Sequence, residues 1–244
     1  MSVAATAAPQ VLLLPGWHNS GPDHWQSRWE TLYGYTRVEQ HDWDLPRRGD
    51  WLARLDDVVQ STSGPLVLVA HSLGCVLVAA WAKYSQHRQR VTGALLVAPA
   101  DVEQEHLRPV LPSWAPIVRE PLPFASRVVA SRNDPFGPWP RIQALAQGWG
   151  SELVDVGACG HINAESGLGN WPAGHALLAP WLRQWPAPDT WIPPHLHNAR
   201  NGTHTWSPRK SKGWAGGWKA CSAPSWAMRW RAEAPPPTTR RRWC

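Results

Sequence analysis

The chain has 244 residues, enough for one large domain with a sizeable hydrophobic core. Its 43% hydrophobic and 17% charged residues exclude a wholly disordered or fibrous protein. The net charge of +6 suggests an anionic partner, but the charge is unevenly distributed along the chain.

The basic residues are concentrated in residues 186–244. This segment holds ten Lys or Arg against two acidic residues, and its only branched aliphatic residues are Ile192 and Leu196. Burial cannot offset its ordering entropy, so we expect a largely disordered tail after a single domain over residues 1–185. Its seven Trp and its arginines leave three interpretations: nucleic-acid binding, an extension without a role, or out-of-frame translation. We favour the two that involve no nucleic-acid partner.

Neither a secretory signal nor a membrane-spanning segment is expected. Residues 1–9 lack a basic start and a long apolar stretch, and polar residues interrupt the most apolar run, residues 66–82. The cysteines form no C-x-x-C pair and have no metal-ligand spacing; they are Cys75, Cys159, Cys221 and Cys244. We therefore predict a cytoplasmic protein in a reducing compartment, with no membrane partner.

Short aliphatic runs alternate with amphipathic segments of helix length. The expected strands cover residues 11–14, 36–39, 66–70, 94–98, 127–131 and 152–156. The expected helices cover residues 22–33, 50–61, 73–87, 139–149 and 174–185. The proline-rich residues 101–126 predict a loop excursion. The alternation predicts an α/β fold, with a doubly wound and mostly parallel sheet covered by helices on both faces.

Three polar residues each follow one of the expected strands. Ser72 follows the strand at 66–70, Asp134 follows the strand at 127–131, and His161 follows the strand at 152–156. The carboxyl ends of parallel strands meet at one edge of a sheet, where α/β domains bind their ligands. We therefore expect these three side chains to lie together.

The turn at Ser72 matches the pattern of a nucleophile elbow. In this pattern a strained turn between a strand and a helix raises the serine above the sheet, with small residues two positions before and after it. Ala70 and Gly74 occupy those positions, so alanine replaces the usual first glycine. The alternative interpretation is an ordinary turn serine.

A serine nucleophile needs a base to accept its proton and an acid to hold that base in one tautomer. We assign His161 as the base and Asp134 as the acid, because Ser–Asp–His is the chain order of α/β hydrolases. Asp101 is the alternative acid, and Asp134 would then only cap a helix. His175 is the alternative base, disfavoured because no strand precedes it. This chemistry needs no cofactor.

The oxyanion of such a reaction needs two backbone N–H donors. The first is expected from Leu73, and the second from Gly16 or Trp17, of which Trp17 is favoured. Trp17 and His18 are expected to edge a small substrate pocket between the loops 17–29 and 101–126. His18 and His24 lack a third ligand, so we expect no metal site.

Further motifs accompany these turns along residues 10–185. They are Pro15-Gly16, Asn19-Ser20-Gly21, His24-Trp25, Trp29, Asp42-Trp43, His71-Ser72-Leu73-Gly74, Asn133-Asp134-Pro135, Gly160-His161-Ile162-Asn163, Gly167, Gly169 and Trp171-Pro172. Together they resemble the small serine hydrolases related to retinoblastoma-binding protein 9. The resemblance implies a compact α/β-hydrolase fold without a large lid, a Ser72–Asp134–His161 triad, and ester or amide hydrolysis of small substrates.

Two departures limit what the resemblance implies. Residues 186–244 have no counterpart in it, and the L-x-C-x-E motif of retinoblastoma-pocket binding is absent because residues 73–77 end in Leu77. We therefore predict a serine hydrolase that acts on small esters, and less readily on amides, through an acyl-enzyme. The alternatives are a non-catalytic interaction module on the same fold, or nucleic-acid binding by the tail.

Overall fold

A computed structural model describes residues 8–182, so the predicted tail and the end of the last predicted helix lie outside the described residues. The strands are β1 (Gln10–Leu14), β2 (Thr36–Arg37), β3 (Leu66–His71), β4 (Val91–Val97), β5 (Ser126–Ala130) and β6 (Glu152–Asp155). They form one sheet in the order β2-β1-β3-β4-β5-β6, and every neighbouring pair is parallel.

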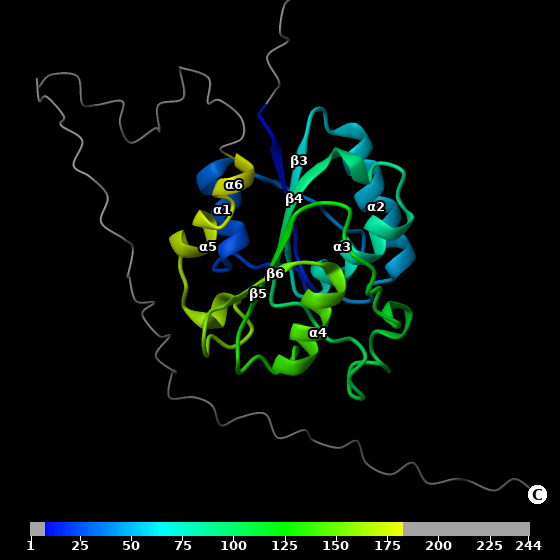
Figure 1. Cartoon of the computed structure of the whole chain (residues 1–244), viewed down its shortest axis with the longest axis vertical. Coiled ribbons are helices and arrows are strands. Elements are labelled where there is room, and N and C mark those ends of the chain that lie inside the picture. Colours follow the sequence, from blue (N-terminus) through cyan, green and yellow to red (C-terminus); the bar gives the residue numbers. More distant parts are fainter. Residues whose placement is uncertain (1–7, 183–244) are drawn as a thin grey trace, which may run out of the picture.

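Helices cover both faces of this sheet (Figure 1). On one face lie α1 (Trp25–Tyr33), α5 (Pro172–Ala176) and α6 (Ala179–Leu182), and on the other lie α2 (Arg48–Ser61), α3 (Leu73–Tyr84) and α4 (Trp139–Trp149). The predicted doubly wound α/β fold is therefore confirmed. Within residues 8–182, no helix has both the length and the apolar character needed to cross a membrane.

The strands supply side chains to two separate cores. In β3, Leu66, Leu68 and Ala70 pack against α2, α3 and α4. The alternate residues Val67 and Val69 pack against α1 and α6 on the opposite face. Burial of both sets explains why this strand is a continuous aliphatic run rather than an alternating one.

The last predicted helix differs from the observed structure. Residues 174–185 were expected to form one helix, but α5 ends at Ala176 and α6 starts at Ala179. Pro180 accounts for the break, since its ring clashes with the carbonyl four residues earlier and it has no N–H to donate. Proline is tolerated only in the first turn of a helix, which is where α6 places it.

The predicted loop excursion at residues 101–126 is confirmed, with a single 3₁₀ turn at Pro112–Trp114. The buried Trp114 holds this segment against the domain: its indole N–H donates to the Pro46 carbonyl at 2.9 Å, and its ring meets Trp51 edge-on. The segment therefore covers the first turn of α2 without adding a strand or a long helix.

Gly74 generates a prediction about packing. A Cβ at this position would lie 2.4 Å from the Leu14 carbonyl oxygen and 2.9 Å from the Pro15 carbonyl oxygen, both of which are backbone atoms at the end of β1. Gly74→Ala should therefore push α3 away from β1 and lower the free energy of unfolding by about 1–3 kcal/mol.

The matched control is Gly49→Ala, in the exposed first turn of α2, where a Cβ meets nothing within 4 Å. This change should be neutral or stabilise the protein by up to about 1 kcal/mol. Urea unfolding of the two variants measures the difference, and equal stabilities would contradict the packing argument.

Candidate active site

Ser72 lies in a strained turn between β3 and α3. Its φ of 54° and ψ of −118° form a combination that residues other than glycine rarely adopt. The fully buried Ala70 and the crowded Gly74 flank the turn, so neither position has room for a larger side chain. This backbone has the geometry of a nucleophile elbow.

Ser72, His161 and Asp134 lie in one hydrogen-bonded row. The Ser72 Oγ is 2.9 Å from His161 Nε2, and His161 Nδ1 is 2.9 Å from both carboxylate oxygens of Asp134. A carboxylate only accepts hydrogen bonds, so Nδ1 carries the proton and Nε2 is left to accept one from the serine hydroxyl. The Asp134 side chain is 2% exposed and that of His161 is 11% exposed, so water competes little for these bonds.

Two residues at the end of β5 join the turns that carry Asp134 and His161. Asn133 Oδ1 accepts a hydrogen bond from the Gly160 N–H at 2.8 Å, and Ser131 Oγ accepts one from the Cys159 N–H at 2.9 Å. Ser131 also donates to Asn133 at 2.8 Å. Sequence reasoning missed the role of Ser131, although short polar residues just after a strand commonly bond to nearby backbone.

The two alternative site residues have other partners. Asp101 accepts two hydrogen bonds from Arg141, at 2.8 and 3.0 Å. His175 Nε2 lies 2.7 Å from the hydroxyl of Tyr35, and its ring stacks on Tyr33. Within residues 8–182, neither Asp101 nor His175 forms a hydrogen bond with Ser72 or His161.

His71, the residue before Ser72, supports the backbone of the predicted base. Its Nε2–H donates to the His161 carbonyl at 2.9 Å, and its ring packs between those of His24 and His161. Burial, together with these two imidazoles, holds the pKa of His71 well below its usual range. The ring is therefore neutral, and it packs and hydrogen-bonds rather than transferring a proton.

His24 begins α1 and is also neutral. Its Nδ1 accepts a hydrogen bond from the Gln26 N–H at 3.1 Å, so the proton of the neutral ring is on Nε2. That Nε2 is buried with no partner among residues 8–182. Burial, followed by the charges of His161 and Arg37, lowers the pKa of His24 to about 3.

Two backbone N–H groups near the serine are available to bind an oxyanion. Leu73 is the first residue of α3, and Trp17 lies in a turn closed by a 3.1 Å hydrogen bond from the Asn19 N–H to the Gly16 carbonyl. Within the described part of the chain, neither N–H of Leu73 or Trp17 donates to an acceptor. Gly16 packs so closely on Ser72 that a Cβ there would lie 2.7 Å from the serine Cβ.

A pocket of about 360 Å³ opens over these groups. Its apolar wall consists of Trp17, Ala100, Leu107, Leu111 and Phe136. Among residues 8–182, Glu165 is the only carboxylate on the lining, and no Lys or Arg lines it. The predicted pocket residue His18 stands at the exposed edge, where its Nδ1 is 2.8 Å from the Asp44 carboxylate.

Comparison with known proteins identifies a family and several structures of similar fold. The family model described as serine hydrolase matches residues 11–180. A YdeN-like hydrolase from Pectobacterium atrosepticum is 31% identical, with a TM-score of 0.65 over 74% of this chain and 94% of that chain. The ydeN gene product of B. subtilis is 22% identical, with a TM-score of 0.61 over 72% and 99% of the two chains.

A more distant neighbour is esterase 2 of Thermogutta terrifontis. It is 16% identical, with a TM-score of 0.55 over 75% of this chain and 87% of that chain, and so shares the fold alone. No curated protein sequence matches this chain significantly.

The neutral His24 generates a prediction about acid stability. Its pKa is about 3 in the folded protein and 6.5 in the unfolded chain, so the unfolded chain binds more protons below pH 6.5. The contribution of His24 to stability is therefore complete above pH 6.5 and is lost as the pH falls toward 3. Between pH 7.5 and pH 5 the loss is about 2 kcal/mol, and His71 adds a loss of the same sign.

Urea unfolding at pH 7.5 and pH 5 tests this expectation. His24→Asn keeps an acceptor at the start of α1 and removes the titrating ring, so the difference in stability between the two pH values should shrink by about 2 kcal/mol. His106→Asn, at an exposed position, is the control and should leave the difference unchanged. An unaltered pH dependence in His24→Asn would refute the assignment.

Proposed function

We propose that this chain, which belongs to the serine hydrolase family, hydrolyses small uncharged carboxylic esters by means of Ser72, His161 and Asp134. The observation that carries the proposal is the unbroken row of 2.9 Å hydrogen bonds from Ser72 Oγ to the Asp134 carboxylate, beneath a pocket. An ordinary turn serine has no need of a base that a buried carboxylate holds in one tautomer.

In the first half of the reaction, Ser72 Oγ attacks the ester carbonyl carbon while its proton passes to His161 Nε2. Asp134 stabilises the imidazolium that forms. The tetrahedral intermediate then collapses, the bond to the leaving alcohol breaks, and the alcohol takes the proton from His161. Water repeats the sequence on the acyl-enzyme, which releases the carboxylic acid and restores Ser72.

The negative oxygen of each tetrahedral intermediate needs donors that are already in place. The N–H groups of Leu73 and Trp17 are the best candidates, because both are near Ser72 and neither has an acceptor within residues 8–182. The start of α3 also contributes the positive end of its helix dipole. Losing one such donor typically costs a factor of about 100–1000 in kcat.

The pocket favours small and uncharged substrates. Its volume of about 360 Å³ is near the lower end of the range of about 300–1000 Å³ usual for small-molecule sites. An anionic substrate would lose hydration to an apolar wall and meet Glu165, and no described Lys or Arg lines the pocket to compensate it. Amides are poorer substrates than esters here, because an amine is a poorer leaving group than an alcohol and depends more on the proton that His161 delivers.

Within the serine hydrolase family, we further propose a relationship to retinoblastoma-binding protein 9, based on the motifs at Gly16, Ser72, Asp134 and His161. We assign the hydrolase domain to residues 1–185, of which the family model matches 11–180. A cytoplasmic location accords with Cys75, a buried free thiol whose hydrogen bond to the Val97 carbonyl would be lost in a disulfide.

Labelling with a fluorophosphonate probe tests the nucleophile. The native chain should be labelled, and Ser72→Ala and His161→Ala should not, because the first removes the nucleophile and the second removes its base. Asp134→Asn should slow labelling by a factor of about 100 to 10,000, since the base then loses its tautomer control. Gel fluorescence over time, corrected for folded protein, measures these rates.

Matched controls come from the alternative site residues. Asp101→Asn and His175→Gln should label within about threefold of the native rate, because within residues 8–182 neither side chain forms a hydrogen bond with Ser72 or His161. A folded native chain that the probe does not label, or labelling that survives Ser72→Ala, would overturn the proposed function.

Acyl-chain length tests the substrate class. With 4-nitrophenyl esters, kcat/KM should be highest for acyl groups of about two to six carbons and fall at least about tenfold for a decanoyl group, because a longer chain exceeds the pocket. An acyl group that ends in a carboxylate should react more slowly than a neutral one of equal length. Glu165→Gln should narrow that gap, and an equal gap in both proteins would contradict the role given to charge.

A further inference from the structure

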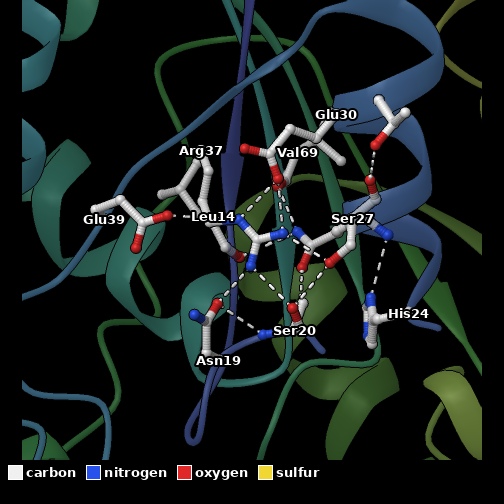
Figure 2. Close-up of polar contacts among 11 residues, drawn as sticks. Leu14, Asn19, Ser20, His24, Ser27, Glu30, Arg37, Glu39 and Val69 are labelled. Carbon is white, nitrogen blue, oxygen red and sulfur yellow. Dashed lines mark hydrogen bonds and ion pairs between the residues drawn. The ribbon is translucent and has the colours of Figure 1, made fainter. Parts of the chain in front are cut away.

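Arg37 places a guanidinium group in the interior beside the loop that follows β1. Its side chain is only 8% exposed, although β2 is an edge strand. Nε and Nη2 donate to the Glu30 carboxylate at 3.0 and 2.7 Å, and Nη2 also donates to Ser27 Oγ at 2.7 Å. Nη1 donates to Asn19 Oδ1 at 2.7 Å and to the Ser20 carbonyl at 2.9 Å (Figure 2).

Apart from a 3.7 Å ion pair between Nε and the Glu39 carboxylate, just after β2, the partners of Arg37 divide into two groups. Glu30 and Ser27 belong to α1, and they neutralise the charge and anchor the guanidinium. Nη1, in contrast, donates only to the loop, at Asn19 and Ser20. One rigid, planar group therefore connects α1 and β2 to the loop after β1.

The backbone of this loop adopts an uncommon conformation that hydrogen bonds help to hold. His18 and Asn19 both have positive φ, of 63° and 64°, which is costly for residues other than glycine. Asn19 also closes the turn at Gly16, and its Oδ1 accepts a hydrogen bond from the Ser20 N–H at 2.7 Å. Such a conformation persists only where its surroundings fix it.

A buried glutamine fixes the same loop from the direction of the sheet. Gln26 Nε2 donates to the carbonyls of Leu14 and Val69, at 3.3 and 3.1 Å, and its Oε1 accepts from Ser20 Oγ at 2.8 Å. Ser20 is thus tied to the carboxyl ends of β1 and β3, while Arg37 holds its carbonyl (Figure 2). The loop is held at its base on both sides.

We propose that Arg37 is a positioning residue for the reaction: through Asn19 and Ser20, it sets the place of the Trp17 N–H relative to Ser72. The inference rests on the proposed function, since it takes the turn at residues 16–19 to carry the second oxyanion donor. Gly16, in that turn, has no free space toward Ser72. A displacement of the turn therefore changes the distance between donor and oxyanion directly.

The expected effect is on the transition state rather than on substrate binding. A misplacement of about 1 Å in a catalytic site can cost about 100-fold in rate. The ground-state ester does not yet carry the oxyanion, so its binding changes little. Loss of Arg37 should accordingly lower kcat about 10- to 100-fold and change KM by less than about threefold.

The experiment compares Arg37→Ala with the native full chain on 4-nitrophenyl butyrate, with active sites counted by fluorophosphonate labelling. The Ki of an alkyl boronic acid, which forms a tetrahedral adduct on serine, should rise by the same factor as kcat falls. Added guanidinium chloride at non-denaturing concentration should restore part of kcat in Arg37→Ala. Asn19→Gly keeps the positive φ, removes the Oδ1 acceptor, and should reproduce the kcat defect.

Arg127→Ala is the matched control. Arg127 also donates to a glutamate and to a backbone carbonyl, at Glu152 and Leu177, both at 2.8 Å. It lies near the amino end of β5, whereas the site lies at the carboxyl ends of the strands. This variant should lose stability without a change in kcat or in the boronic acid Ki.

The outcomes separate the two proposals. One outcome is that folded Arg37→Ala keeps Ser72-dependent turnover with an unchanged kcat, or with a change in KM alone. Either result overturns the positioning role and leaves the proposed function standing. A native chain without Ser72-dependent turnover overturns both. If Arg37→Ala does not fold, Arg37→Lys and Asn19→Gly take its place, and normal kcat in both would overturn the inference.

Discussion

The close approach of α3 to the carboxyl end of β1 determines the geometry of the whole site. With no side chain at Gly74, the helix backbone rests directly on the carbonyls of Leu14 and Pro15. The same contact brings Gly16 against Ser72 and puts the first turn of α3 beside the loop after β1. The serine, the helix N–H groups and the loop are therefore in direct contact with one another.

The buried ionisable side chains in and beside the site are compensated in two ways. The Asp134 carboxylate faces His161, and the Arg37 guanidinium faces Glu30, so these charges are paired. His24 and His71 have no such partner and stay neutral instead. The imidazole of His71, which packs on His161, and that of His24, which packs on His71, therefore carry no charge at neutral pH.

Sequence patterns predicted the sheet and the strand-end residues for a clear reason. Continuous aliphatic runs mark buried parallel strands, and the turns after such strands must meet at one edge, which brought Ser72, Asp134 and His161 into a single hypothesis. The break between α5 and α6 was missed, although Pro180 is a visible cause. No local sequence pattern indicated the contacts of Arg37 and Gln26, because these contacts depend on the pairing of β1 with its neighbouring strands.

Part of the pocket wall and the hydrogen-bonded row of Ser72, His161 and Asp134 lie on different kinds of segment. Ser72, Asp134 and His161 follow strands whose neighbours fix them. Leu107 and Leu111 instead belong to the irregular segment 101–126, which packs on the domain through Leu111, Trp114 and Ile117. Leu107 stands outside both cores of strand residues, whereas Leu111 packs within one of them. A designer could therefore reshape the pocket wall at Leu107 without opening a cavity in either core, whereas a change at Leu111 would alter the pocket and the core together.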